Sequence, residues 1–152
     1  MATSIAKLGL SADYQPVLLV AALSGVLTQW QSFVVSAARK KAGVKYPAPY
    51  ASNEEAERNP DAKRFNCAQR AHANTLEHFP YFLFSLLHVG LTYPKTATGL
   101  GAIWIVGRIL YTIGYASGVA ARRNSSGGVI HVIGSFGLMG TSVYLAVKGV
   151  LA

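Results

Sequence analysis

Charged residues are scarce in this chain, and their scarcity decides the class of protein. Of its 152 residues, 13% are charged and 51% are hydrophobic, whereas a typical soluble domain carries about 25% charged residues. Intrinsic disorder is excluded because it requires low hydrophobicity and a high net charge. An internal disulfide is excluded because Cys67 is the single cysteine. Together with 15 glycines, this composition indicates one domain that resides in a lipid bilayer.

Four weakly charged runs are long enough to cross a bilayer as helices. The run from Pro16 to Ala38 holds no charge and, at 1.5 Å per residue, spans a hydrocarbon core of roughly 30 Å. It is too long for a signal-peptide core, and no basic segment crowds its start. The sequence therefore predicts an all-α integral membrane protein, with residues 1–152 forming a single membrane domain. We expect a four-helix bundle with spans at residues 16–38, 65–93, 96–118 and 128–148.

The chain has 14 Lys and Arg against 6 Asp and Glu, and most of the cations lie in two loops. They occur in the connector 39–64 and after the third span at Arg122 and Arg123, whereas the opposite side holds Lys7, Lys95 and Lys148. By the positive-inside rule, the basic loops are expected in the cytoplasm and the termini across the membrane. The basic excess is thus a topology signal rather than a nucleic-acid interface. The connector is expected to be solvated and partly irregular, with room for some order of its own.

Polar side chains also occur inside the second span, at Arg70, Asn74 and Glu77. Their spacing of i, i+4 and i+7 places them on one helix face. Charges at membrane depth are costly unless they pair or meet a polar cavity. One interpretation is a structural Arg–Glu pair that fixes the bundle. The other is a pocket for a ligand with a carboxylate, an amine and amides, because an Arg fork binds carboxylates and the Glu binds an ammonium.

The third span offers a matching face, since Arg108, Tyr111, Tyr115 and Arg122 are spaced as nearly one stripe of a helix. The tyrosines suit either an interfacial belt or the walls of a pocket. Arg122 suits either a membrane anchor or the stabilisation of an anion such as a thiolate. Glycines that let helices approach closely in lipid occur in the third and fourth spans, at Gly114, Gly118, Gly134, Gly137 and Gly140.

Two contiguous phrases carry a resemblance. Residues 65–80 read Phe-Asn-Cys-Ala-Gln-Arg-Ala-His-Ala-Asn-Thr-Leu-Glu-His-Phe-Pro, and residues 104–111 read Trp-Ile-Val-Gly-Arg-Ile-Leu-Tyr. With Gly114 and Tyr115, they resemble the family of membrane-associated proteins in eicosanoid and glutathione metabolism (MAPEG). The resemblance covers nearly the whole chain. It implies a homotrimer of four-helix protomers that binds glutathione between neighbouring subunits within the membrane.

The resemblance also implies a set of site residues. Arg122 matches the arginine that stabilises the glutathione thiolate, and Lys40 matches a further basic residue near the site. The leukotriene-C4-synthase branch has Gln, Tyr and Arg where this chain has His72, His78 and Lys40, which weakens the case for leukotriene A4 as substrate. The positions matching that branch's glutathione contacts are Arg39, Arg70, His72, Asn74, Glu77, His78, Tyr111 and Tyr115.

The implied activity is that of a membrane-bound glutathione transferase or peroxidase, with glutathione as co-substrate and a lipophilic electrophile or lipid hydroperoxide as its partner. The implied location is the endoplasmic reticulum or the outer mitochondrial membrane. No spacing supports a metal site or a haem held between His72 and His131, and Cys67 is interpreted as structural. The alternatives are a non-enzymatic lipid-binding scaffold resembling five-lipoxygenase-activating protein, and a small channel. A channel lacks the support of a broken-helix pair or an inverted repeat.

Overall fold

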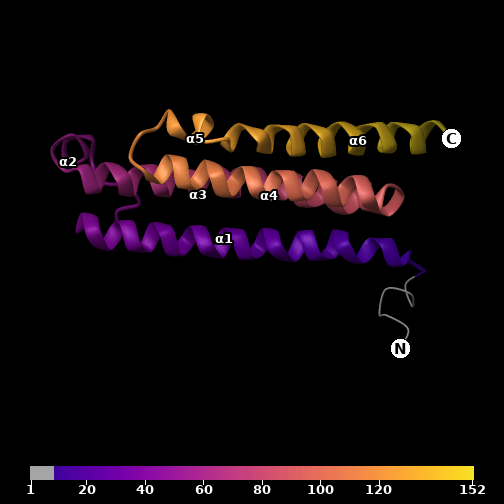
Figure 1. The fold of residues 1–152 in the computed structure, drawn as a ribbon, viewed down its shortest axis with the longest axis horizontal. Coiled ribbons are helices and arrows are strands. Elements are labelled where there is room, and N and C mark those ends of the chain that lie inside the picture. The colour runs from indigo at the N-terminus through magenta and orange to yellow at the C-terminus, as the bar shows by residue number, and fades with distance from the viewer. Residues whose placement is uncertain (1–8) are drawn as a thin grey trace.

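The computed structural model describes residues 9–152, which fold as a bundle of long α-helices (Figure 1). Lys7, one of the charges expected on the second side of the membrane, lies outside these residues. The described part of the chain contains no β-strand. The long helices are α1 (Gln15–Ala42), α3 (Pro60–Thr92), α4 (Pro94–Ala116) and α6 (His131–Leu151). The short elements are η2 (Ala12–Tyr14), α2 (Asn53–Arg58), α5 (Arg122–Ser125) and η3 (Gly128–Ile130).

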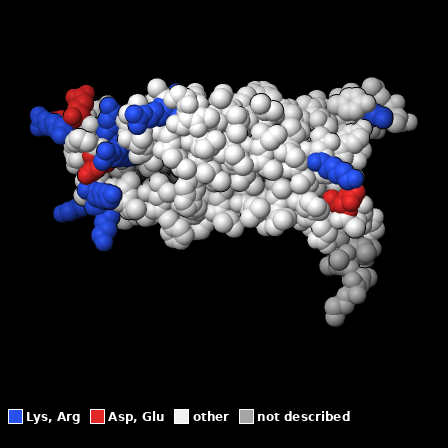
Figure 2. Space-filling model, in the orientation of Figure 1, with Lys and Arg blue, Asp and Glu red and all other residues white. Residues whose placement is uncertain are grey.

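Within residues 9–152, three segments are long and apolar enough to cross a membrane, namely Ala12–Ala42, Pro94–Ala116 and Gly128–Leu151. They include α1, α4 and α6. Helix α3 is longer, at 33 residues. It is not one of these three segments, because its first half carries several charged side chains. Figure 2 shows that Lys, Arg, Asp and Glu gather at the two ends of the bundle and leave the middle of the visible face uncharged. Most of them lie at the end where α1 stops and α3 starts.

The connector between the first two spans is more helical than expected. Arg39, Lys40 and Lys41 form the last turn of α1, where cations suit the negative end of the helix dipole. That helix stops at Gly43, which adopts a left-handed φ of 70°. A capping box between Ser52 and Glu55 starts α2, and α3 follows directly. The connector 39–64 therefore has order of its own, as its length allowed. Its bounds are wrong for a loop, because α1 runs on to Ala42 and α3 already starts at Pro60.

The expectation that Arg122 continues the stripe of the third span on one helix is also wrong. Helix α4 ends at Ala116, and Gly118 adopts a φ of +87°, which glycine tolerates better than other residues. Arg122 begins the separate helix α5. Gly114 and Gly118 consequently do not form a packing pair on one helix. A Cβ at Gly114 would overlap the backbone carbonyl of Arg122, so this glycine lets α5 approach α4.

Helices α3 and α4 form the centre of the bundle, and each contacts both α1 and α6. The core between them includes Trp104, stacked on Phe82 with ring centroids 3.7 Å apart. Both side chains are fully buried. The glycine stripe of the fourth span packs as expected at two of its three positions. A Cβ at Gly134 would lie 2.6 Å from the Leu100 carbonyl oxygen and one at Gly137 would lie 2.9 Å from the Leu100 side chain, whereas Gly140 has open space.

Candidate functional site

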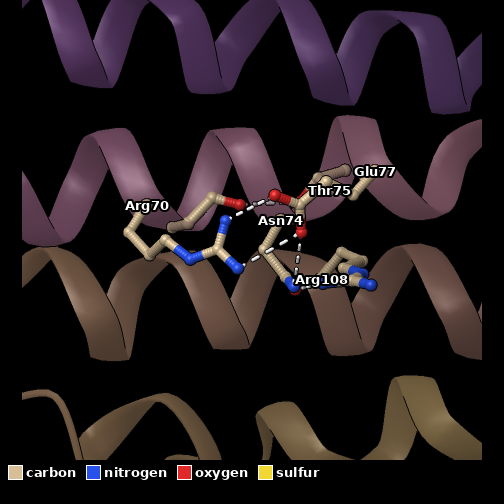
Figure 3. A network of polar contacts seen from close by, with 6 residues as sticks. Arg70, Asn74, Thr75, Glu77 and Arg108 are labelled. Atoms are coloured by element: carbon tan, nitrogen blue, oxygen red, sulfur yellow. Dashed lines mark hydrogen bonds and ion pairs between the residues drawn. The ribbon is translucent and has the colours of Figure 1, made fainter. Parts of the chain in front are cut away.

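Four polar side chains of α3 and α4 form one connected network, which runs from the exposed face of the protomer to its interior (Figure 3). Arg70 donates two hydrogen bonds to the Glu77 carboxylate, at 2.6 Å from Nη1 and 3.2 Å from Nη2. The side-chain amide of Asn74 donates to Glu77 at 3.4 Å. Arg108 of α4 donates to the Asn74 carbonyl oxygen at 2.7 Å. Asn74 therefore links an ion pair on one helix to a cation on the next.

Arg108 is the most enclosed member of this polar network. Its side chain is 0% exposed, and its Nε and Nη2 atoms are buried without a hydrogen-bond partner. Its guanidinium carbon lies 5.4 Å from the ring centroids of both Trp104 and Tyr111, at the edge of cation–π range. A buried cation with unused donors is costly. Arg108 therefore makes the interior of the bundle attractive to acceptor groups.

A second buried cluster fixes the helices that carry this network. Gln31 of α1 donates from Nε2 to Thr75 Oγ1 at 2.9 Å and to Thr112 Oγ1 at 2.7 Å. All three side chains are buried. Thr75 directly follows Asn74 on α3, and Thr112 donates to the backbone carbonyl of Arg108 on α4. This three-helix cluster (Gln31, Thr75 and Thr112) thus sets the register in which Asn74 meets Arg108.

The two expected tyrosines lie together on α4. The rings of Tyr111 and Tyr115 pack edge to face with centroids 5.6 Å apart. Tyr111 also packs edge to face on His131, at 5.5 Å. The guanidinium of Arg123 lies over Tyr115, 5.3 Å from its centroid. Of the two arginines that follow α4, Arg123 rather than Arg122 contacts the tyrosine pair within one protomer.

The two histidines of the expected site have different surroundings. His78 Nδ1 lies 2.6 Å from the hydroxyl of Tyr81. The Nδ1 atom of His72 is buried and has no hydrogen-bond partner. Because His72 stands two residues from both Arg70 and Asn74, it lies on the opposite face of α3 from the polar network. The structure therefore does not bring His72 to the network within a single protomer.

The remaining expected residues lie at the basic end. The guanidinium of Arg39 lies over the rings of Tyr46 and Phe65, at 4.4 and 4.5 Å, and donates to the Ala48 carbonyl oxygen at 2.8 Å. It therefore holds the connector against the bundle. Arg122 and Lys40 are exposed. Across residues 9–152, no hydrogen bond or ion pair joins Arg39, Lys40 or Arg122 to the polar network.

Sequence reasoning missed the buried partners of the site. The stripe of the third span includes Arg108, and it is the only charge of that span, but the resemblance does not place it among the glutathione contacts. Neither the spacing nor the resemblance assigns a role to Gln31, Thr75 or Thr112. The run 16–38 holds two side-chain amides, at Gln29 and Gln31. They were a usable signal, because an amide at membrane depth requires partners on other helices.

The arrangement defines an all-helical membrane protein with a polar site between its central helices. Comparison with known proteins then gives the family. The MAPEG family model matches residues 17–144, so the chain belongs to the MAPEG family, as the two phrases of its sequence indicate. It is also 39% identical over 98 residues to a protein of Synechocystis sp. that is itself described as uncharacterised. That match covers 64% of this chain and 64% of the relative.

Proposed function

We propose that this protein is a membrane-bound glutathione transferase or peroxidase, most similar to microsomal glutathione S-transferase 3. The observation that carries the proposal is the polar network, which extends from a half-exposed ion pair to a buried guanidinium. MAPEG membership supports it, because the family name itself includes glutathione metabolism. In this proposal α3 also crosses the membrane, as the second of four spans, and glutathione is the co-substrate.

The chemistry of the network matches a charged peptide. Glutathione carries two carboxylates, an ammonium, two amides and a thiol. Arg70 offers a planar fork for a carboxylate, Glu77 offers an acceptor for the ammonium, and Asn74 offers both halves of an amide. Tyr111 and Tyr115 supply phenol donors and flat apolar walls. These groups would have to open their present contacts to take the ligand, and the pair is accessible enough to do so.

Exposure of the ion pair supports a homotrimer. The side chains of Arg70 and Glu77 are 45% and 52% exposed in one protomer, yet they lie near the middle of α3. Their neighbour Arg108 is eight residues from Ala116, the last residue of α4. This corresponds to a depth of roughly 12 Å along the helix axis from that end. Charges at that depth are costly against lipid tails. A neighbouring subunit that covers this face, with glutathione in between, removes the cost.

The same assembly gives roles to residues that stand apart in one protomer. His72 on the opposite face of α3 and Arg39 at the end of α1 would act on the glutathione held by a neighbouring subunit. Arg122 would stabilise the thiolate. A free thiol has a pKa near 8.5 and is mostly protonated at neutral pH, and a guanidinium at hydrogen-bond distance favours the ionised form. The lipophilic partner would enter from the bilayer between helices.

Orientation and location are parts of the same proposal. The end that gathers most of the basic side chains would face the cytoplasm, in accordance with the positive-inside rule. The membrane would be that of the endoplasmic reticulum, or alternatively the outer mitochondrial membrane. In either membrane, glutathione reaches the network from the cytoplasmic side, because the network lies in the basic half of the bundle.

The test is a titration of the purified protein with glutathione, followed by the ultraviolet absorbance of the thiolate. We expect a saturable signal that Arg122→Gln loses and that Lys45→Gln retains, since Lys45 is an exposed cation of the same end that is no part of the proposed site. Turnover is then measured with a lipophilic electrophile, a lipid hydroperoxide and leukotriene A4. Arg122→Gln should mainly lower kcat, whereas Arg70→Gln should mainly raise the glutathione KM.

Two results would contradict the proposal. A protein that binds no glutathione but retains lipophilic ligands would be a lipid-binding scaffold. Equal kinetic defects in Arg122→Gln and Arg70→Gln would refute the division between thiolate stabilisation and binding.

A further inference from the structure

A second candidate site lies at the basic end of the bundle, away from the polar network. Three helix ends meet there and enclose a groove of about 290 Å³. Its walls come from the last turns of α1, the first turns of α3 and the end of α4. We call it the basic groove; it is lined by Val34, Ala37, Ala38, Lys41, Asp61, Arg64 and Ala116.

The basic groove is apolar on the side of the membrane and charged at its outer end. Val34 and Lys41 are seven residues apart on α1, which corresponds to roughly 10 Å along the helix axis. Residues 15–38 carry no charge and residues 39–41 are all cationic, so the headgroup boundary falls near Lys41 if α1 spans the bilayer. The groove therefore crosses the level at which lipid chains meet lipid headgroups.

The cations of the groove are available to a ligand. Lys41 is exposed, and within residues 9–152 its ammonium takes part in no ion pair. Nη1 of Arg64 donates to Asp61 at 3.1 Å, which engages one edge of that guanidinium. The stem of Arg64 packs on Gly118, where a Cβ would lie 2.9 Å from Arg64 Cγ. That contact holds the side chain over the groove.

We propose that the basic groove binds one anionic phospholipid, with its phosphate between Lys41 and Arg64 and one acyl chain along Val34, Ala37 and Ala116. Ammonium and guanidinium groups are the usual partners of phosphate, and basic pockets between membrane helices suit anionic headgroups. Charge complementarity favours this occupant over a second copy of the chain. The basic end of a second copy, from a protein of formal net charge +8, would bring more cations to Lys41 and Arg64.

The experiment uses the full chain, purified in detergent, and native mass spectrometry with phosphatidylserine and phosphatidylcholine as probes. We expect preferential retention of phosphatidylserine. Replacing each cation should weaken retention about fivefold, so Lys41→Gln combined with Arg64→Gln should nearly abolish the preference. The matched control, Lys45→Gln combined with Arg58→Gln, removes two charges from the same end outside the groove and should leave the preference unchanged.

Two further variants keep the proposal falsifiable if the double variant folds poorly. Asp61→Asn should strengthen retention of phosphatidylserine, because it removes a repelling carboxylate and frees Arg64. Ala37→Trp, which fills the apolar wall, should weaken retention without changing any charge.

Four results would overturn the proposal. Equal losses in the groove variant and its control would indicate general surface attraction. Equal retention of the two lipids would exclude headgroup recognition. Competition by soluble glycerophosphoserine as effective as the lipid itself would indicate a phosphate site without an acyl groove. A change of oligomeric state without a change in lipid retention would assign the groove to contacts between copies. None of these results bears on glutathione binding, so the two proposals fail separately.

Discussion

The three-helix cluster leads to an unusual prediction, because its central amide is only half satisfied. Gln31 donates to both Thr75 and Thr112, but its Oε1 atom is buried without a partner. Replacing Gln31 by Leu loses two interhelical hydrogen bonds, each worth about 0.6 kcal/mol on average in membrane proteins. It also removes an unpaired buried acceptor, whose burial costs about 1–3 kcal/mol. We therefore expect Gln31→Leu to leave the free energy of unfolding nearly unchanged or to raise it by up to about 2 kcal/mol.

Removing the threonine hydroxyls should instead lower the free energy of unfolding. Both hydroxyls retain backbone acceptors in the wild type, since Thr75 donates to Ala71 at 3.1 Å and Thr112 donates to Arg108 at 2.8 Å. They therefore stay satisfied as donors when Gln31 is replaced. In Thr75→Val with Thr112→Val, by contrast, the amide N–H groups of Gln31 lose both partners. We expect a loss of about 2–3 kcal/mol, from the cost of leaving buried donors unpaired.

The assay is reversible unfolding in mixed micelles, with the three variants arranged as a double-mutant cycle. The threonine replacements should cost about 2–3 kcal/mol in the wild type and less than about 0.5 kcal/mol in the Gln31→Leu background. A loss above about 2 kcal/mol for Gln31→Leu alone would refute the reasoning, because it would mean that the hydrogen bonds outweigh the unpaired oxygen. Additive costs in the cycle would show that the three side chains do not act as one cluster.

Three further predictions test other parts of the structure. Gly134→Ala should lower the free energy of unfolding by about 1–3 kcal/mol through overpacking. Gly140→Ala should raise it by about 0.5–1 kcal/mol, because the added methyl group meets open space. Unfolding in micelles measures both variants, and equal effects would contradict the packing of Gly134 against α4. Asn74→Leu should cost about 1.5–3 kcal/mol by the same assay, because it removes the acceptor of a buried guanidinium, and a neutral result would contradict that contact. Hydrogen bonds from Ser52 lower the pKa of Glu55, so the capping box should persist at neutral pH and weaken as the pH falls through that lowered pKa. Amide exchange at Glu55 measures this, and Glu55→Gln should remove the pH dependence.

Periodicity and charge spacing were sufficient to predict the helical bundle. Three of the weakly charged runs correspond to α1, α4 and α6, because a long apolar run has few other stable arrangements in lipid. The i, i+4 and i+7 spacing likewise predicted that Arg70, Asn74 and Glu77 share a face, since that relation is local to one helix. The family was also predictable from two contiguous phrases, which the family model confirms.

Tertiary contacts and helix ends were less predictable. The stripe through Arg122 assumed that helical period continues past Gly118, but a left-handed glycine ends the helix. The partner of Asn74 is Arg108, and that choice depends on the rotation of α4 against α3, which no local pattern specifies. Asn66 lies within the phrase that carries the family resemblance, yet its amide both accepts from and donates to the backbone of Ala51. A conspicuous phrase can therefore contain residues that position the connector rather than a ligand.

The position of α3 explains why its charges are tolerated. Of the four long helices, α3 looks least like a membrane span, and yet it lies at the centre and packs against α1, α4 and α6. Because Arg70, Asn74 and Glu77 share one face of α3, that face is costly against lipid and requires polar partners. The central position of α3 supplies one of them, since Arg108 of α4 donates to Asn74. The face that the protomer leaves half exposed is the face of the ion pair. If α3 spans the bilayer, that face requires a polar cover, and the proposed neighbouring subunit with bound glutathione supplies one.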